Sequence, residues 1–140
     1  MEPFRTQIRL VNFPKISDER GNLSFFESSN EIPFSIERAY WIYDVPGGEI
    51  RGGHAYKNLQ EVVVALSGSF DVVLNDGSET MRFTLNRSYM GLYIPRMIWR
   101  HMENFSTNSL ALIVSDKLYE AGEYIRDFED YKIVVNELER

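Results

Sequence analysis

The sequence predicts an all-β fold of the jelly-roll or sandwich type, with a short helical segment at its C-terminal end. Runs rich in Val, Ile, Tyr, Phe and Trp recur about every ten residues, separated by Gly, Asn, Asp and Pro, which is typical of short consecutive strands. Residues 75–78 (Asn-Asp-Gly-Ser) have Asp and Gly where a tight hairpin needs positive backbone angles. A domain of many short strands encloses an interior that can hold a ligand.

The expected strands follow one another along the chain and give way to a helical pattern only at its end. We expect strands at residues 7–13, 23–27, 36–43, 61–66, 69–75, 80–85, 91–94, 99–104 and 110–114. Within residues 119–139, apolar residues spaced three and four apart predict a short amphipathic helix or turn. No linker or low-complexity tract divides the chain, so residues 1–140 are expected to form one domain.

Composition narrows the class of protein. The chain has 140 residues, of which 44% are hydrophobic and 26% charged. No apolar run approaches the roughly 20 residues that a membrane helix requires, so no membrane association is expected. The absence of cysteine removes disulfides, thiolate nucleophiles and thiolate metal ligands. The absence of cysteine and an N-terminus without signal-peptide features together favour a cytoplasmic location.

The excess of acidic side chains bears on which partners the protein can bind. With 21 acidic against 15 basic side chains, the formal net charge is -6, which opposes binding to a polyanion. Nucleic acid is therefore not an expected partner. A small anionic ligand remains compatible with the sequence, because a few arginines in one cleft reverse the local sign of the potential.

The segment 51–68 (RGGHAYKNLQEVVVALSG) contains the residues best suited to chemistry. Residues two apart on a strand share a face, so His54 and Tyr56 are expected to point the same way, towards the interior. The pair Gly52-Gly53 allows a sharp turn of the backbone. With Glu61 and Gly68, this layout resembles the first cupin motif, in which two histidines and a glutamate bind a metal.

A metal site is nevertheless not expected. Tyr56 occupies the place of the second histidine of that motif, and residues 91–104 resemble the second cupin motif with Arg100 at the expected ligand position. A guanidinium has no free lone pair for a metal. His101 adjoins Arg100 and is expected to face the opposite side of its strand. His54 and Glu61 alone do not make a three-ligand site, so we predict no metal and no other cofactor.

A closer resemblance covers most of the chain. The residues that carry it are 51–57, 68–69, 76–77, 91–93 and Trp99, together with the flanking segments 32–38 and 119–126. They resemble the sugar 3,4-ketoisomerases. This resemblance implies a cupin-type jelly-roll β-barrel that is metal-free and homodimeric, with N-terminal strands such as 7–13 exchanged between copies. It also implies conversion of dTDP-4-keto-6-deoxyglucose into its 3-keto isomer for bacterial surface sugars.

The residues present suit that reaction. Moving a ketone from C4 to C3 removes a proton beside the carbonyl, passes through an enediolate and returns a proton to the neighbouring carbon. Histidine suits this transfer because its ordinary pKa of about 6.5 populates both protonation states near neutrality. The resemblance selects His54 over His101 as the base. Tyr56, with an ordinary pKa of about 10, is a poor base and is assigned the role of hydrogen-bond donor.

Three arginines are candidates for binding the substrate. A guanidinium offers a planar fork of donors to the paired oxygens of a pyrophosphate. We assign this role to Arg20, Arg51 and Arg100, the first because residues 18–23 (DERGNL) resemble an early segment of the same family. Arg100 is expected to face inwards and so to influence which face of C4 is reprotonated.

Three other functions remain open at this stage. The first is a non-catalytic cupin that binds a sugar nucleotide, with Tyr56 marking the loss of an acid–base pair. The second is a 3,5-epimerase of the same barrel type, which commonly pairs a histidine with an aspartate and a tyrosine, although the sequence shows no matching arrangement of His and Asp. The third is a metal-dependent cupin enzyme, for which metal content is the discriminating measurement.

Overall fold

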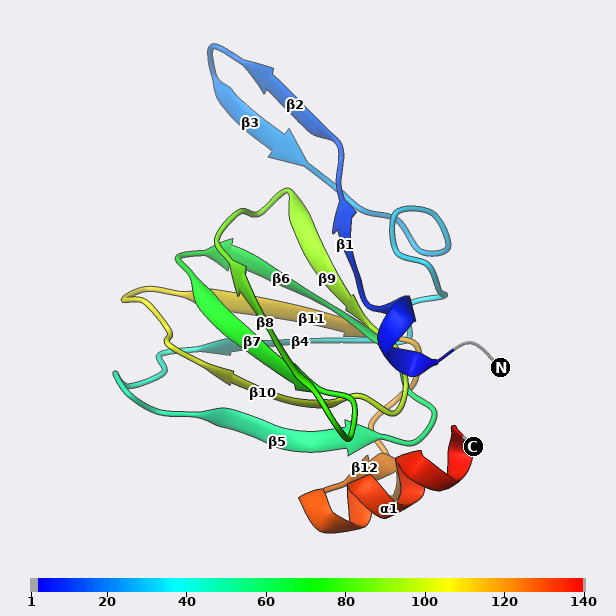
Figure 1. Cartoon of the computed structure of the whole chain (residues 1–140). Helices are drawn as coiled ribbons and strands as arrows, with labels where there is room; N and C mark the ends of the chain where they lie inside the picture. Colours follow the sequence, from blue (N-terminus) through cyan, green and yellow to red (C-terminus); the bar gives the residue numbers. More distant parts are fainter. Residues whose placement is uncertain (1–2, 140) are drawn as a thin grey trace.

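The computed structural model describes residues 3–139, and this part of the chain forms an antiparallel β-sandwich with one α-helix (Figure 1). The strands are β1 (Arg9–Asn12), β2 (Lys15–Asp18), β3 (Gly21–Ser24), β4 (Arg38–Tyr43), β5 (Arg51–Tyr56), β6 (Glu61–Ser67), β7 (Phe70–Asn75), β8 (Thr80–Leu85), β9 (Met90–Ile94), β10 (Trp99–Glu103), β11 (Leu110–Ser115) and β12 (Tyr124–Ile125). The helix is α1 (Phe128–Leu138), and short 3-10 turns lie at Phe4–Gln7 and Ala121–Glu123. The predicted all-β class with a helical C-terminal segment is confirmed.

Two five-stranded sheets face each other across the main core. Their strand orders are β1-β9-β6-β11-β4 and β12-β5-β10-β7-β8. Val63 and Ile113 from the first sheet and Val72 and Leu74 from the second belong to this core. Within residues 3–139, no hydrogen-bonded strand pair joins the two sheets, so the predicted jelly-roll barrel takes the form of an open sandwich rather than a closed barrel.

Strand β6 is buried on both of its faces, which explains its continuous apolar run. Val63 and Ala65 point into the main core, whereas Val62 and Val64 belong to a second cluster on the other side of the sheet. Phe34, from the segment between β3 and β4, is part of that second cluster. A strand covered on both faces reads as uniformly apolar instead of alternating.

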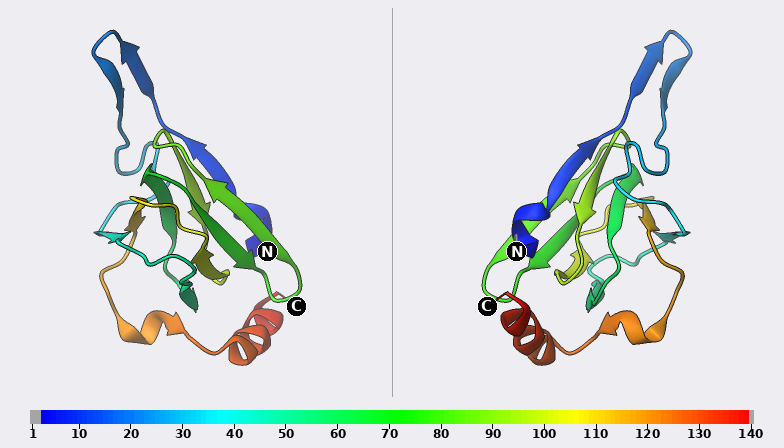
Figure 2. Two further views of the ribbon diagram at one scale, coloured as in Figure 1. Left: turned by 90° about the vertical axis from the view of Figure 1, so that its left-hand side faces the viewer. Right: turned by 90° about the vertical axis from the view of Figure 1, so that its right-hand side faces the viewer.

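The hairpin formed by β2 and β3 stands away from the sandwich (Figures 1 and 2). The strand predicted at 7–13 corresponds to β1, and the strand predicted at 23–27 overlaps the end of β3, whereas β2 was not predicted. All four residues of β2 are exposed. A strand that buries no face shows no apolar alternation, so the pattern that reveals other strands is absent from β2.

The C-terminal segment contains a shorter helix than the predicted range of 119–139. Helix α1 begins after Asp127, whose side chain accepts a hydrogen bond from the backbone of Asp130 and so caps the first turn. Tyr131 and Val135 are its buried residues. The preceding residues form β12, which pairs with β5 instead of joining the helix. In the described part of the chain, no helix is long and apolar enough to cross a membrane.

Candidate active site

A cavity of about 250 Å³ lies between the two sheets. Strands of both sheets contribute its polar side chains, which are Arg38, Tyr40, Arg51, His54, Tyr56, Glu61, Arg100 and Tyr124. Apolar residues of the main core close the remaining walls, among them Val63, Val72 and Ile113. An apolar cavity with a few converging polar and titratable groups is the arrangement expected of an active site.

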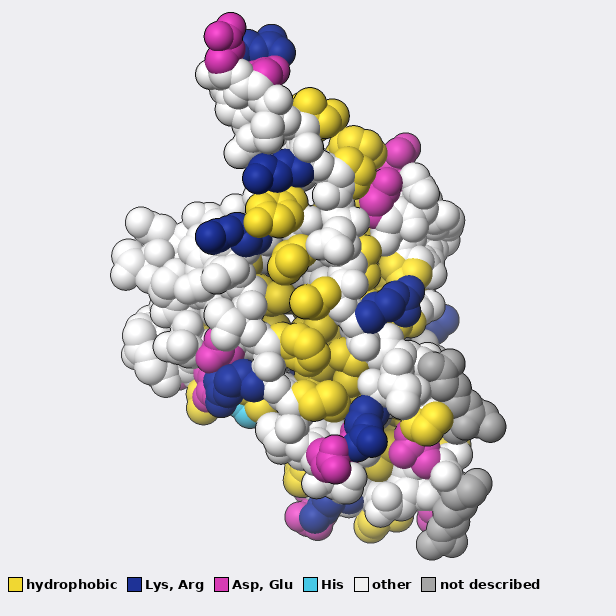
Figure 3. Space-filling view, turned by 45° about the horizontal axis from the view of Figure 1, so that its top comes forward, with side chains coloured by type: hydrophobic (Ala, Val, Ile, Leu, Met, Phe, Trp, Pro, Cys, Tyr) yellow, Lys and Arg dark blue, Asp and Glu magenta, His cyan; other side chains and the backbone are white. Residues whose placement is uncertain are grey.

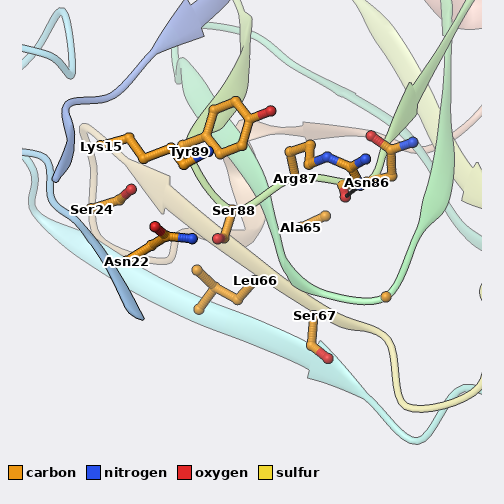
Figure 4. Close-up of a pocket in the computed structure, with 11 residues that line it drawn as sticks. Lys15, Asn22, Ser24, Ala65, Leu66, Ser67, Asn86, Arg87, Ser88 and Tyr89 are labelled. Atoms are coloured by element: carbon orange, nitrogen blue, oxygen red, sulfur yellow. Dashed lines mark hydrogen bonds between the residues drawn. The ribbon is translucent and has the colours of Figure 1, made fainter. Parts of the chain in front are cut away.

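A second, larger cavity of about 580 Å³ lies outside the sandwich, at the base of the hairpin (Figure 4). Lys15 and Tyr89 face it from one side, with the ammonium of Lys15 4.7 Å from the centre of the Tyr89 ring. No histidine, aspartate or glutamate is part of its lining. It therefore offers no imidazole or carboxylate as a general base, and the cavity between the sheets, which holds His54, is the candidate active site.

A bulge in β5 determines which side chains enter the cavity. Arg100 of β10 pairs with His54 and the next residue, His101, pairs with Gly52, so Gly53 is the extra residue. Gly52 and Gly53 have φ angles of +100° and +87°, which favour glycine. Simple alternation would place residues 51 and 54 on opposite faces. Because of the bulge, both line the cavity.

His54 lies in the cavity as a neutral imidazole. Burial, followed by the positive charges of Arg100 and Arg126, lowers the pKa of His54 to about 3. The sequence-based expectation of an ordinary value near 6.5 therefore does not describe this histidine in the ligand-free protein. Its Nε2 atom is buried and has no hydrogen-bond partner among the described residues. A buried polar atom without a partner is uncommon and points to a functional role.

Tyr56 lies against His54, with ring centres 4.8 Å apart in an edge-on arrangement. The Tyr56 hydroxyl donates to the hydroxyl of Tyr124 at 3.4 Å. Burial, followed by the negative charge of Glu61, raises the pKa of Tyr56 well above its usual range. The phenol therefore keeps its proton at neutral pH, as a hydrogen-bond donor must.

Tyr40 is a cavity residue that sequence reasoning missed. Its hydroxyl donates to Oε2 of Glu61 at 2.7 Å, and burial, followed by the charge of Glu61, raises its pKa far above the ordinary value. The alternation of β4 offered a signal, since Arg38, Tyr40 and Ile42 share the face that lines the cavity. An aromatic residue in a strand is ordinary core material, so this signal carried no chemical meaning by itself.

Arg100 is buried in the cavity beside Glu61. Its Nη1 atom donates to Oε1 of Glu61 at 2.6 Å and its Nη2 atom to the carbonyl of Ile98 at 3.0 Å. The guanidinium also lies 4.9 Å from the centre of the Tyr56 ring. Its Nε atom is buried and has no hydrogen-bond partner among the described residues. The inward direction expected for Arg100 is what the structure shows.

The other predicted site residues occupy different environments. Arg51 lines the cavity. Arg20 lies at the turn of the hairpin, where its guanidinium donates to Asp18 at 2.8 Å, and the structure does not bring it to the cavity of its own chain. His101 is not part of the cavity lining, and its Nε2 atom lies 3.6 Å from a carboxylate oxygen of Glu103.

The donor set of the cavity does not resemble a metal site. Glu61, the glutamate that matches the cupin motif, has both carboxylate oxygens engaged by Arg100 and Tyr40. Within residues 3–139, no cluster of three or more His, Cys, Asp or Glu side chains is arranged to hold a metal ion. The groups present are suited to proton transfer and anion binding.

Comparison with known proteins gives a consistent result. A family model described as WxcM-like, C-terminal (FdtA) matches residues 6–136. The TDP-4-oxo-6-deoxy-α-D-glucose 3,4-oxoisomerase of Aneurinibacillus thermoaerophilus is 40% identical over 124 residues, which cover 89% of each chain.

Two solved structures extend the comparison to the fold. A 3,4-ketoisomerase from Helicobacter canadensis superposes with a TM-score of 0.89 at 40% identity, covering 92% of this chain and 97% of that one. A mutant of the 3,4-ketoisomerase QdtA from Thermoanaerobacterium thermosaccharolyticum, in complex with TDP-4-keto-6-deoxyglucose, superposes with a TM-score of 0.91 at 32% identity, covering 93% and 94% of the chains.

The fold, the cavity and the similar proteins together show that this chain is an isomerase of the cupin-like class. Within that class, the chain belongs to the WxcM-like, C-terminal (FdtA) family. The resemblance to the sugar 3,4-ketoisomerases is confirmed.

Proposed function

We propose that this protein isomerises TDP-4-keto-6-deoxyglucose to the corresponding TDP-linked 3-keto-6-deoxyhexose. The observation that carries the proposal is a neutral histidine in a partly apolar cavity, with a buried Nε2 atom that has no partner among the described residues. A relative 40% identical over 89% of the chain is a 3,4-oxoisomerase of this sugar nucleotide. The 3-keto product is suited to the synthesis of deoxysugars for a bacterial surface glycan.

His54 moves the proton between the two carbons. In the neutral form it accepts the C3 proton, and the electron pair of the broken C–H bond forms the C3–C4 double bond of the enediolate. The imidazolium then returns the proton to C4. Negative charge that develops on the enediolate raises the pKa of His54 during the reaction and stabilises the imidazolium.

A second proton must move between the oxygens, because the C3 hydroxyl becomes a carbonyl while the C4 carbonyl becomes a hydroxyl. Tyr56 relays this proton: its hydroxyl gives a proton to the C4 oxygen, where negative charge develops, and takes up the proton that the C3 hydroxyl loses, so the phenol is neutral before and after the step. Its raised pKa keeps the phenol protonated, and its ring lies 4.8 Å from that of His54. The buried guanidinium of Arg100 stabilises the charge of the enediolate.

The pyrophosphate requires cations at the open side of the cavity. Arg51 lines the cavity, as does Arg38, which also stacks 4.6 Å from the centre of the Tyr40 ring. Arg126 contacts the ring of Tyr124 at 4.1 Å. These guanidiniums provide the local positive charge that a dianionic pyrophosphate needs on a protein of net charge -6.

Proton NMR of the sugar nucleotide in deuterium oxide with the purified protein tests this function. We expect deuterium to enter the product at C4, and the signals of a 3-keto sugar nucleotide to increase with time. In a parallel reaction in ordinary water, the coupling between H4 and H5 of the product reports its C4 configuration. Binding of TDP without exchange or conversion would instead support the alternative of a non-catalytic sugar-nucleotide-binding protein.

The homodimer implied by the family resemblance has support in the exposed surface. Leu10, Ile16, Leu23 and Phe25 are exposed on β1, the hairpin and the segment that follows it. Figure 3 shows hydrophobic side chains gathered on the face below the hairpin. A second copy that covers this surface would remove it from water. Such an arrangement also offers Arg20 a route to a substrate, in the cavity of the partner.

Light scattering tests the homodimer. We expect the mass of a dimer for the wild type and the mass of a monomer for Leu23→Glu, because a charge at an apolar contact is costly to bury. Glu137→Gln, at an exposed position on α1 and far along the chain from the hairpin, serves as the control and should remain dimeric. A wild-type protein that elutes with monomer mass at all concentrations contradicts the proposal.

The cytoplasmic location stays a prediction, measurable by cell fractionation.

A further inference from the structure

Glu61 connects the two sheets at the cavity. It begins β6 and is 2% exposed. Its Oε2 atom accepts the hydroxyl proton of Tyr40 from β4 at 2.7 Å, and its Oε1 atom accepts from Arg100 of β10 at 2.6 Å. One carboxylate therefore holds a phenol from one sheet and a guanidinium from the other.

We propose that Glu61 is a positioning residue that fixes the Tyr40 hydroxyl and the Arg100 guanidinium around the oxygens of the substrate. The inference rests on the proposed function and deepens it, because it assigns a role to a residue that does not itself transfer the proton. Glu61 acts through these two partners and keeps them in place while charge moves across the enediolate.

The energetics of burial favour this role over a purely structural one. A buried ion pair contributes little net stability, because desolvation of the two charges offsets their attraction. An apolar pair of similar volume would serve the core at least as well. The ion pair instead borders a cavity in which Nε2 of His54 and Nε of Arg100 lack hydrogen-bond partners among the described residues. Buried polar groups left in this state are characteristic of functional sites.

The charge of Glu61 also controls the protonation of its neighbours. Burial is the larger cause of the raised pKa of Tyr40 and of Tyr56, and the negative charge of Glu61 is the next one in each case. The groups that face this point from the surrounding strands are Arg38, His54, Arg100 and Tyr124. Without the carboxylate, the cation of Arg100 would be uncompensated and would favour tyrosinate. Glu61 therefore keeps both phenols protonated, with the Tyr40 proton directed at the carboxylate and a lone pair of the Tyr40 oxygen left to accept from a substrate hydroxyl.

Glu61→Gln is the direct test, because glutamine keeps the shape and loses the charge. We expect kcat for TDP-4-keto-6-deoxyglucose to fall about 10²-fold with KM changed by less than about threefold. The basic limb of the pH profile of kcat should move to lower pH. Tyrosinate absorbance should also develop at lower pH than in the wild type, and Tyr40→Phe should reduce that difference.

Asp71→Asn is a matched control on the opposite side of the second sheet. Asp71 is 6% exposed and likewise accepts from one arginine, Arg82 at 2.8 Å, and from one hydroxyl, Thr84 at 2.7 Å. It is not part of the cavity lining. We expect a smaller loss of thermal stability than in Glu61→Gln, because Arg82 is half-exposed and stays hydrated, and kcat per folded molecule changed by less than about threefold. An equal loss of kcat in both variants would overturn the proposal.

A further variant keeps the test decisive if Glu61→Gln does not fold. The double variant Glu61→Gln/Arg100→Gln removes both buried charges and so avoids an unpaired guanidinium. We expect its kcat to be no lower than that of Tyr40→Phe/Arg100→Gln, because Glu61 acts only through Tyr40 and Arg100 and that reference variant lacks both partners. A kcat well below that of Tyr40→Phe/Arg100→Gln, or wild-type kcat in Glu61→Gln, would overturn the proposal. The tyrosinate titration needs no substrate, so failure of the proposed reaction is distinguishable from failure of this inference.

Discussion

Replacing His54 by asparagine should lower kcat by about 10³-fold or more, because asparagine fills a similar space but cannot accept the C3 proton. Exchange of solvent deuterium into the substrate and formation of the 3-keto product should disappear together, since one imidazole serves both half-reactions. TDP affinity should change by less than about threefold, as measured by calorimetry, because the pyrophosphate is assigned to the arginines. NMR in deuterium oxide measures both rates.

The other histidine supplies the control for this variant. His101 is not part of the cavity lining and lies 3.6 Å from Glu103, so His101→Asn should keep kcat close to that of the wild type. The protein has two histidines, so the two variants together separate loss of the base from loss of any imidazole. If His54→Asn retained more than about a tenth of the wild-type kcat, another group would have to be the base.

The stability of the folded protein should decline on acidification, and His54 should account for a large share of the decline. The folded-state pKa of His54 is about 3, below the ordinary value of 6.5. Between these values the unfolded chain binds a proton that the folded chain does not, so acid favours unfolding. The slope is about 1.4 kcal/mol per pH unit, or about 2 kcal/mol between roughly pH 6.5 and pH 5. Above pH 6.5 this contribution no longer changes.

Urea unfolding at a series of pH values measures this effect. The free energy of unfolding of His54→Asn should depend less steeply on pH over this interval than that of the wild type, by about the stated amount. Other titrating groups are common to both proteins, so their contributions cancel in the comparison. Parallel pH profiles for the two proteins would show that His54 titrates with an ordinary pKa, contrary to its buried environment.

The relation between the Gly52-Gly53 pair and the cavity shows the limit of local patterns. The sequence indicated a sharp turn at these glycines, which is correct as a statement about backbone freedom. It did not indicate that the turn is a bulge against β10, because a bulge is defined by the pairing of two strands. That pairing brings Arg51 to the same side as His54.

Tyr40 and Glu61 mark a different limit. Glu61 was considered only as a metal ligand of the cupin motif, and Tyr40 received no role. Their contact, and that of Glu61 with Arg100, crosses from one strand to another and, for Arg100, from one sheet to the other. Sequence separation says nothing about such contacts, because they depend on the strand order within a sheet and on how the two sheets stack.

The sequence by itself determined the class of fold, the family and the orientation of His54 and Tyr56 towards the interior, because these depend on composition, motif order and the two-residue period of a strand. Tertiary structure alone decided the protonation of His54, the partners of Glu61 and the distance between Arg20 and the cavity of its own chain. Burial and charge proximity exist only after two sheets pack together, and the direction of a protruding hairpin depends on contacts distant in sequence.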